Sequence, residues 1–310
     1  MKAKAIKAVL RKKINEWADT IEDPFVQDLV LKDTIVTGGA IASMLLRESV
    51  NDYDVYFRTR ETARRVALYY IARFHPKQTN GIPVPIFVEE KDDRIAIAVK
   101  SAGVASADGT TKAYQYFEGA PAADADAYVS EVMDNPGDIE ERYVEEQEKA
   151  ERVEDKGYRP VFVSTNAITL SNRVQVIIRF FGEPDKIHEN YDFVHCTNYW
   201  TSHDDQLVLR PAALEALLTR ELRYVGSKYP VASLIRLRKF IQRGWSVNAG
   251  QILKMIMQVN TLNLKNYEVL REQLTGVDCA YFTQVLDALA NKDPTKIDTA
   301  YLVEIIDRMF

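Results

Sequence analysis

Ile35-Val36-Thr37-Gly38-Gly39-Ala40-Ile41-Ala42-Ser43-Met44-Leu45-Leu46 is the stretch that decides the fold, and Asn51-Asp52-Tyr53-Asp54-Val55-Tyr56-Phe57 follows it. The apolar residues before the glycines predict a strand that enters a tight turn, and the composition after them predicts a helix over 40–46. Glycine lets an anion approach the backbone N–H groups closely, and a helix N-terminus favours negative charge. The turn at Gly38 and Gly39 is therefore a candidate phosphate cradle, to which Ser43 would add a hydroxyl unless it is a simple helix residue.

The second half of the stretch carries two carboxylates. Residues two apart on a strand face the same side, so Asp52 and Asp54 are expected to point into one space. Carboxylate oxygens suit Mg²⁺, which proteins usually hold with one or two carboxylates plus substrate phosphates. The alternative is a solvated acidic pair beside Tyr53.

This combination of strand, Gly-Gly turn, helix and Asp-x-Asp resembles the signature of the polymerase-β-like nucleotidyltransferases. That superfamily includes tRNA CCA-adding enzymes, poly(A) polymerases, aminoglycoside nucleotidyltransferases and small MNT antitoxins. The resemblance implies transfer of NMP from an NTP, with ATP or CTP favoured, to an acceptor hydroxyl with release of pyrophosphate. It makes Asp52 and Asp54 the catalytic residues and the ligands of Mg²⁺ or Mn²⁺, and it assigns the triphosphate to Gly38, Gly39 and Ser43.

Two later segments resemble the CCA-adding and poly(A) polymerase branch. The apolar strand over 173–180 is followed by Asp192-Phe193, and the helix over 233–243 is rich in Arg and Lys and ends in Gly244-Trp245. The resemblance adds four candidate nucleotide-binding residues: Arg179, Asp192, Arg236 and Lys239. A solvated basic surface is the alternative for the cations, and a helix cap is the alternative for Asp192. The whole arrangement also looks like nucleotidyltransferase-like proteins of large tailed phages.

The chain departs from that branch at three places. Ala42-Ser43 stand where the branch usually has Arg-Asp, and no base-reading motif precedes Arg236. Gln175 takes the position of the third acidic residue, and an amide neither binds a cation as an anion nor activates a hydroxyl. We expect either Asp192 to replace it in space or two carboxylates to suffice.

Composition fits an enzyme with a sizeable core. The chain has 310 residues, of which 46% are hydrophobic, and no apolar run is long enough to span a membrane. Residues 1–22 are expected to form an amphipathic helix and not a signal peptide. Two cysteines form no framework for disulfides or zinc, which favours a cytoplasmic location. Because no long apolar run is present, we expect no membrane partner. His195 and Cys196 are expected on opposite faces of a strand, so they do not suggest a nucleophile pair.

The order of the expected elements predicts an α+β fold. A nucleotidyltransferase core, with a mixed β-sheet and helices, is expected over residues 1–205, with an acidic insertion near 119–157. A mostly helical domain is expected over residues 206–310. The net charge is −5, but the segment 220–243 is basic, as a local polyanion site would be.

Three functions remain open at this point. The first is addition of nucleotides to an RNA 3′ end, such as that of tRNA. The second is transfer to a small molecule or a protein side chain. The third is a catalytically inactive, antitoxin-like binding module. Gln175 favours it, because an amide replaces the third acidic residue there.

Overall fold

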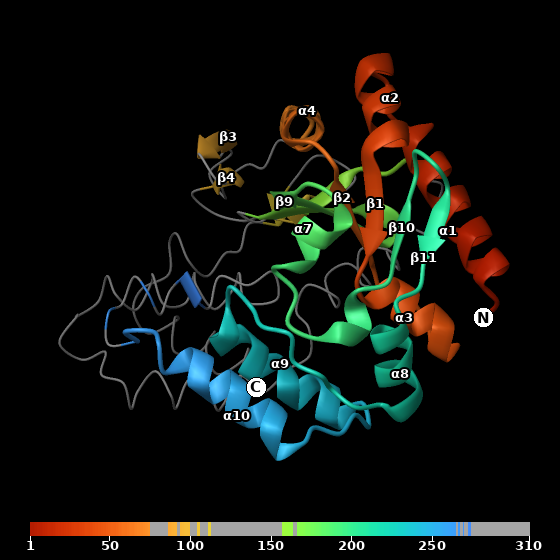
Figure 1. Ribbon diagram of the computed structural model, residues 1–310. Helices are drawn as coiled ribbons and strands as arrows, with labels where there is room; N and C mark the ends of the chain where they lie inside the picture. The colour runs from red at the N-terminus through yellow and green to blue at the C-terminus, as the bar shows by residue number, and fades with distance from the viewer. Residues whose placement is uncertain are drawn as a thin grey trace.

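A computed structural model describes residues 1–74, 86–91, 94–99, 104–105, 111–112, 157–163 and 166–264, with 266, 269 and 272–273. Within these residues a seven-stranded sheet has the order β11-β10-β1-β2-β9-β8-β7 (Figure 1). Its strands are β1 (Thr34–Thr37), β2 (Tyr53–Phe57), β7 (Pro160–Val163), β8 (Ala167–Leu170), β9 (Val174–Phe181), β10 (Tyr199–Thr201) and β11 (Gln206–Val208). The pairing of β2 with β9 is parallel and the other pairings are antiparallel, so the predicted mixed sheet with helices is confirmed.

Three helices cover one face of the sheet: α1 (Ala3–Ala18), α2 (Pro24–Asp33) and α4 (Arg60–Ile71). The apolar positions of α1 recur at helical spacing and are buried, and the indole N–H of Trp17 donates to the Tyr70 hydroxyl at 2.6 Å. Helix α2 was not predicted. Asp23 caps it by accepting the Phe25 N–H at 2.9 Å, and Pro24 takes the first helical position. Asp23-Pro24 therefore starts a helix between the segments 1–22 and 34–118, where no element was expected.

Alternation along the central strands separates the two faces of the sheet. Val55 and Phe57 in β2 join the core under the helices, as do Val174, Val176 and Ile178 in β9. The residues between them face the other way. In β2 those residues include Asp54 and Tyr56, and in β9 they are Gln175, Ile177 and Arg179. The candidate site lies on this second face.

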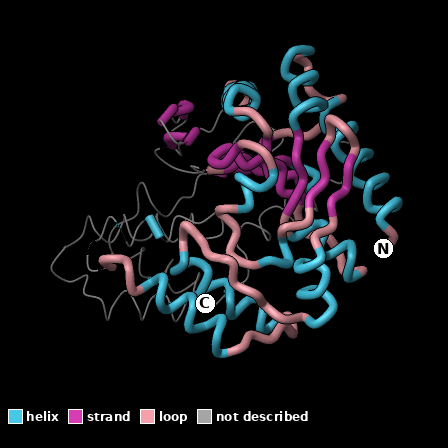
Figure 2. The backbone as a smooth tube through the Cα atoms, viewed as in Figure 1, coloured by secondary structure: helices cyan, strands magenta, loops and turns pink. Residues whose placement is uncertain are grey.

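A second group of helices lies at one end of the sheet, below it in Figures 1 and 2. It consists of α3 (Gly39–Leu46), α8 (Pro211–Thr219), α9 (Pro230–Gln242) and α10 (Ala249–Val259). Ala42 of α3 packs into a core with Leu217, Trp245 and Met255. Its neighbours Ala40, Ile41 and Met44 pack into the core of the sheet. Helix α3 thus joins the two cores.

The remaining elements are short. They are α7 (Pro184–His188), the 3₁₀ turns Ser171–Arg173 and Val194–Cys196, and the hairpins β3 (Ile86–Lys91) with β4 (Arg94–Val99) and β5 (Val104–Ala105) with β6 (Thr111–Lys112). Strands β10 and β11 were not predicted, and the sheet continues to Val208, past the expected boundary at 205. The acidic insertion, apart from Gly157, lies outside the described residues, as do nearly all residues after 264. The division into two domains stays a prediction.

Candidate active site

The turn between β1 and α3 requires glycine at its first position. Gly38 has φ +88°, and a Cβ added there would lie 2.7 Å from Oδ2 of Asp54. Gly39 has no atom within 4 Å of such a position and begins the helix. The Gly38 N–H donates to the Cys196 carbonyl at 3.1 Å. Because the Gly38 N–H is already engaged, the N–H groups that could bind a phosphate are those of the first turn of α3, and no side chain caps them.

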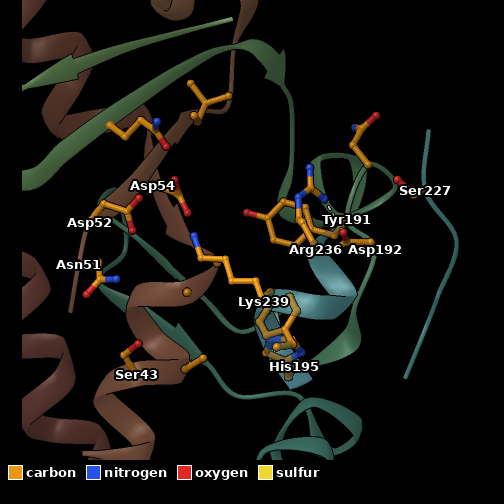
Figure 3. A pocket seen from close by; sticks show the side chains of 18 of the residues that line it. Ser43, Asn51, Asp52, Asp54, Tyr191, Asp192, His195, Ser227, Arg236 and Lys239 are labelled. Atoms are coloured by element: carbon orange, nitrogen blue, oxygen red, sulfur yellow. Dashed lines mark hydrogen bonds and ion pairs between the residues drawn. The ribbon is translucent and has the colours of Figure 1, made fainter. Parts of the chain in front are cut away.

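The two aspartates stand next to this turn. Asp54 lies in β2 and Asp52 immediately precedes that strand, and both are half-buried. Figure 3 shows both side chains with Ser43 and Asn51 at one side of a pocket, and all four residues line it. We call Gly38, Ser43, Asp52 and Asp54 the carboxylate wall. A Cβ at Gly38 is excluded because the Asp54 carboxylate occupies that space.

Strand β9 lies beside the carboxylate wall. The parallel register pairs Asp54 with Gln175, so the residue at the expected third acidic position is a strand neighbour of Asp54. Gln175 is buried and lines the pocket. Arg179, on the same face, is 4% exposed. Its guanidinium donates to Oδ1 of Asn166 at 3.1 Å and lies 4.9 Å from the ring centroid of Tyr229.

Helix α9 supplies the opposite wall. Arg236, Lys239 and Arg243 all line the pocket, and residues three and four apart share one helix face. Figure 3 shows the Lys239 side chain pointing toward the two aspartates. Arg236 forms an ion pair with Asp192. We call Asp192, Arg236, Lys239 and Arg243 the cationic wall.

Asp192 is not a helix cap. One of its carboxylate oxygens accepts the Phe193 N–H at 3.0 Å and the other accepts the Arg236 guanidinium. Its carbonyl accepts the Val225 N–H at 2.9 Å. In Figure 3 it lies beside Arg236, on the far side of Tyr191 from Asp52 and Asp54. This placement does not make Asp192 a substitute for the carboxylate missing at Gln175.

His195 and Cys196 correct another expectation. They lie on a 3₁₀ turn and not on a strand, and both line the pocket. His195 is buried against Trp245 and Phe240, with ring centroids 4.3 Å and 4.9 Å away. Burial lowers the pKa of His195 to about 4, so its ring is neutral at neutral pH.

The pocket has a volume of about 260 Å³, and all nine residues expected at the site line it. Sequence reasoning missed several others: Tyr56, Asn166, Tyr191, His195 and Tyr229. The signal for Tyr56 was present, because it follows Asp54 by two residues on the same strand. The other four have no local signal, because they come from segments that only folding brings to the pocket.

The donor set fits a hard divalent cation. Two carboxylates meet at one wall, and no group of three or more His, Cys, Asp or Glu residues forms a metal cage within the part of the chain that the structure describes. Mg²⁺ usually takes one or two carboxylates and fills its other positions with water and substrate phosphate. Separately, no helix among the described residues is long and apolar enough to cross a membrane.

Comparisons with solved structures find CCA-adding enzymes at a distance. The Thermotoga maritima CCA-adding enzyme complexed with tRNA_CCA is 13% identical, with a TM-score of 0.39, and the match covers 92% of this chain and 57% of that one. The Bacillus stearothermophilus CCA-adding enzyme in complex with CTP is 13% identical, with a TM-score of 0.35, over 84% of this chain and 48% of that one. The chain thus spans about half the length of these structures. Likeness this distant does not assign an activity.

Sequence comparisons give a family. "Gabija anti-defense 2" of Bacillus phage SPbetaL7 is 22% identical over 107 residues, which are 34% of this chain and 27% of the relative. The family model described as "Gabija anti-defense 2 family protein" matches residues 8–220, more than half of the chain and all of the carboxylate wall. The chain belongs to the Gabija anti-defense 2 family.

Proposed function

We propose that this chain is a metal-dependent nucleotidyltransferase that moves NMP from an NTP to an acceptor hydroxyl. One observation carries the proposal. Asp52 and Asp54 beside the Gly38 turn face Lys239 and Arg236 across a single pocket. Two carboxylates opposite a row of cations suit a metal-bound triphosphate, because each wall complements one part of it.

Each wall has a task in this reaction. Asp52 and Asp54 would hold Mg²⁺ or Mn²⁺, which when bound neutralises charge on the phosphates. Lys239 and the N–H groups that open α3 would bind triphosphate oxygens, and Arg179 would add positive charge from β9. The acceptor oxygen bonds to the α-phosphorus, the bond to the bridging oxygen breaks, and pyrophosphate leaves. The hydroxyl proton passes to water, since the Gln175 amide does not take it.

For the acceptor, the basic helix α9 favours an RNA 3′ end, as in tRNA. Arg238 is exposed on that helix, and Arg236, Lys239 and Arg243 follow its pocket side. The relative's name favours a second candidate, a protein side chain of a Gabija defence component. Both acceptors use the same two walls, so the choice between them does not affect the assignment of Asp52 and Asp54.

The test identifies the macromolecule that receives a label from α-labelled NTP. The protein is incubated with each α-labelled NTP, Mg²⁺ or Mn²⁺, and either total RNA or total protein from cells with a Gabija defence. We expect labelled RNA or labelled protein, with ATP or CTP as donor, and none with Asp54→Asn. Calorimetry that shows no NTP binding with either metal, together with no labelled product, overturns the proposal. Anti-defence activity that survives Asp52→Asn and Asp54→Asn would instead assign a binding module.

A further inference from the structure

Two oxygens converge above the Gly38 turn. The point where a Gly38 Cβ would stand lies 2.7 Å from Oδ2 of Asp54 and 3.5 Å from the hydroxyl oxygen of Tyr191. Both residues line the pocket, and Figure 3 shows Tyr191 between the carboxylate wall and Asp192. The phenol therefore stands beside one of the two carboxylates proposed to hold the metal.

The Tyr191 hydroxyl is buried and makes no hydrogen bond of normal geometry with the described residues. The hydroxyls of Thr37 and Tyr56 lie close to it. A tyrosine phenol is a neutral O–H donor at neutral pH, and a buried donor without an acceptor is unfavourable.

The ring that carries this hydroxyl is held firmly. It packs against Tyr56 at 6.1 Å and edge-on to His188 at 5.0 Å, between ring centroids. His188 Nε2 lies 2.8 Å from the Thr37 hydroxyl, which is 2.9 Å from the Asn198 carbonyl. Because that hydroxyl donates to a carbonyl, it accepts from Nε2–H, which fixes the neutral tautomer of His188. Thr37, which precedes Gly38, is thus hydrogen-bonded to His188, and the His188 ring packs against Tyr191.

We propose that Tyr191 is a positioning residue whose hydroxyl donates a hydrogen bond to the Asp54 carboxylate when metal and nucleotide occupy the pocket. The bond selects which carboxylate oxygen turns toward the metal, as outer partners of metal-binding carboxylates do. The inference rests on the proposed function, since it assigns a partner to one of its metal ligands.

The test removes the hydroxyl and keeps the ring. In Tyr191→Phe, the Mn²⁺ dissociation constant, measured by electron paramagnetic resonance with and without NTP, is expected to rise about tenfold. A kcat for transfer about tenfold lower, with the KM for NTP within about twofold, is expected alongside. Thermal melting is expected to be unchanged or slightly raised. The matched control is Tyr199→Phe, because Tyr199 also packs against His188 but does not line the pocket.

The outcomes separate two failures. If Tyr191→Phe binds Mn²⁺ and turns over like wild type while Asp54→Asn loses both, the role of Tyr191 is wrong and the proposed function stands. If Asp54→Asn also binds Mn²⁺ and turns over like wild type, the proposed function fails as well. A lower melting temperature with unchanged Mn²⁺ affinity would make Tyr191 a packing residue only and would overturn the inference.

Discussion

The carboxylate wall and the cationic wall face each other across one pocket but are built in different ways. The first comes from a single contiguous stretch, from Thr34 to Phe57, in which a strand, a turn, a helix and a second strand follow without interruption. The second joins a loop residue, Asp192, to Arg236 of helix α9, 44 residues later in the chain, through an ion pair. The first wall is local and the second depends on long-range packing.

This difference predicts how each wall responds to substitution. In the carboxylate wall the side chains are functional and the backbone is constrained at Gly38, so small changes should affect chemistry. In the cationic wall, Arg236 lines the pocket and also forms an ion pair with Asp192, whereas Lys239 points into the pocket. Substitution of Arg236 should therefore lower both stability and nucleotide affinity, whereas substitution of Lys239 should lower nucleotide affinity alone.

The largest effect is expected at the carboxylates. Asp52→Asn or Asp54→Asn should lower kcat for nucleotide transfer by roughly 100- to 1,000-fold while leaving the thermal melt in place, because each change removes a charge and little packing. Turnover of labelled NTP measures the effect. Asp28→Asn is the control, since Asp28 pairs with Lys32 on the exposed face of α2. Wild-type turnover in both variants would refute the metal assignment, and unfolding of both would make the carboxylates structural.

The two glycines give a matched pair. Gly38→Ala should lower the free energy of unfolding by roughly 1–3 kcal/mol, because φ is +88° and the methyl group meets the Asp54 carboxylate. It should also slow transfer by roughly 10- to 100-fold, since that carboxylate must move. Gly39→Ala should stay within about 0.5 kcal/mol of wild type, as its Cβ meets open space. Urea unfolding and turnover of both variants test the contrast, and equal effects would contradict it.

The two basic residues of the cationic wall should respond differently to substitution. Lys239→Ala should raise the KM for NTP about tenfold without loss of stability, whereas Arg236→Ala should also lower the free energy of unfolding by about 1–2 kcal/mol, because Asp192 loses its partner. If the helix holds RNA instead, the KM for the acceptor rises and the salt slope of RNA binding falls by about one unit per lost contact.

Kinetics at two salt concentrations, together with urea unfolding, separate these cases. Lys254→Ala, at an exposed position of α10, is the control for the loss of one positive charge. If the KM values for NTP and for the acceptor are both unchanged in the double Arg236→Ala, Lys239→Ala variant, α9 lies outside the site. The case for an RNA acceptor would then be weaker than the case for a protein side chain.

The last prediction concerns the aromatic support of the cationic wall, where no effect is expected at neutral pH. Burial lowers the pKa of His195 to about 4, below its ordinary 6.5. The unfolded chain therefore takes up a proton on His195 below pH 6.5 that the folded chain refuses until about pH 4, so stability falls as the pH drops through this window. At pH 5 the cost is about 2 kcal/mol.

Urea unfolding at pH 7 and pH 5 tests this linkage. The loss between the two values should be about 2 kcal/mol smaller in His195→Phe than in wild type. His203→Phe, at an exposed position, should keep the wild-type loss. An equal loss in all three proteins would show that His195 is protonated in the folded state.

Sequence reasoning succeeded where chemistry and local structure coincide. The strand, turn, helix and Asp-x-Asp pair were expected within a few residues of where they lie, because glycine, apolar runs and period-two alternation act over short distances. It failed at β10 and β11, which are three residues each: β10 pairs with β1, which lies far earlier in the chain, and β11 pairs with β10. It also missed α2, although Asp23 and Pro24 are the residues that cap and begin it.

The sequence by itself determined the carboxylate wall and the choice of candidate residues at the pocket, since Gly38, Asp52 and Asp54 are fixed by spacing within two neighbouring elements. Only the tertiary structure decided that Gln175 sits in register with Asp54, that Asp192 pairs with Arg236, and that Tyr191 and His195 reach the pocket. The physical reason is that backbone geometry fixes neighbours two to four residues apart. Contacts between distant segments depend on how whole faces of the sheet and helices bury their apolar side chains.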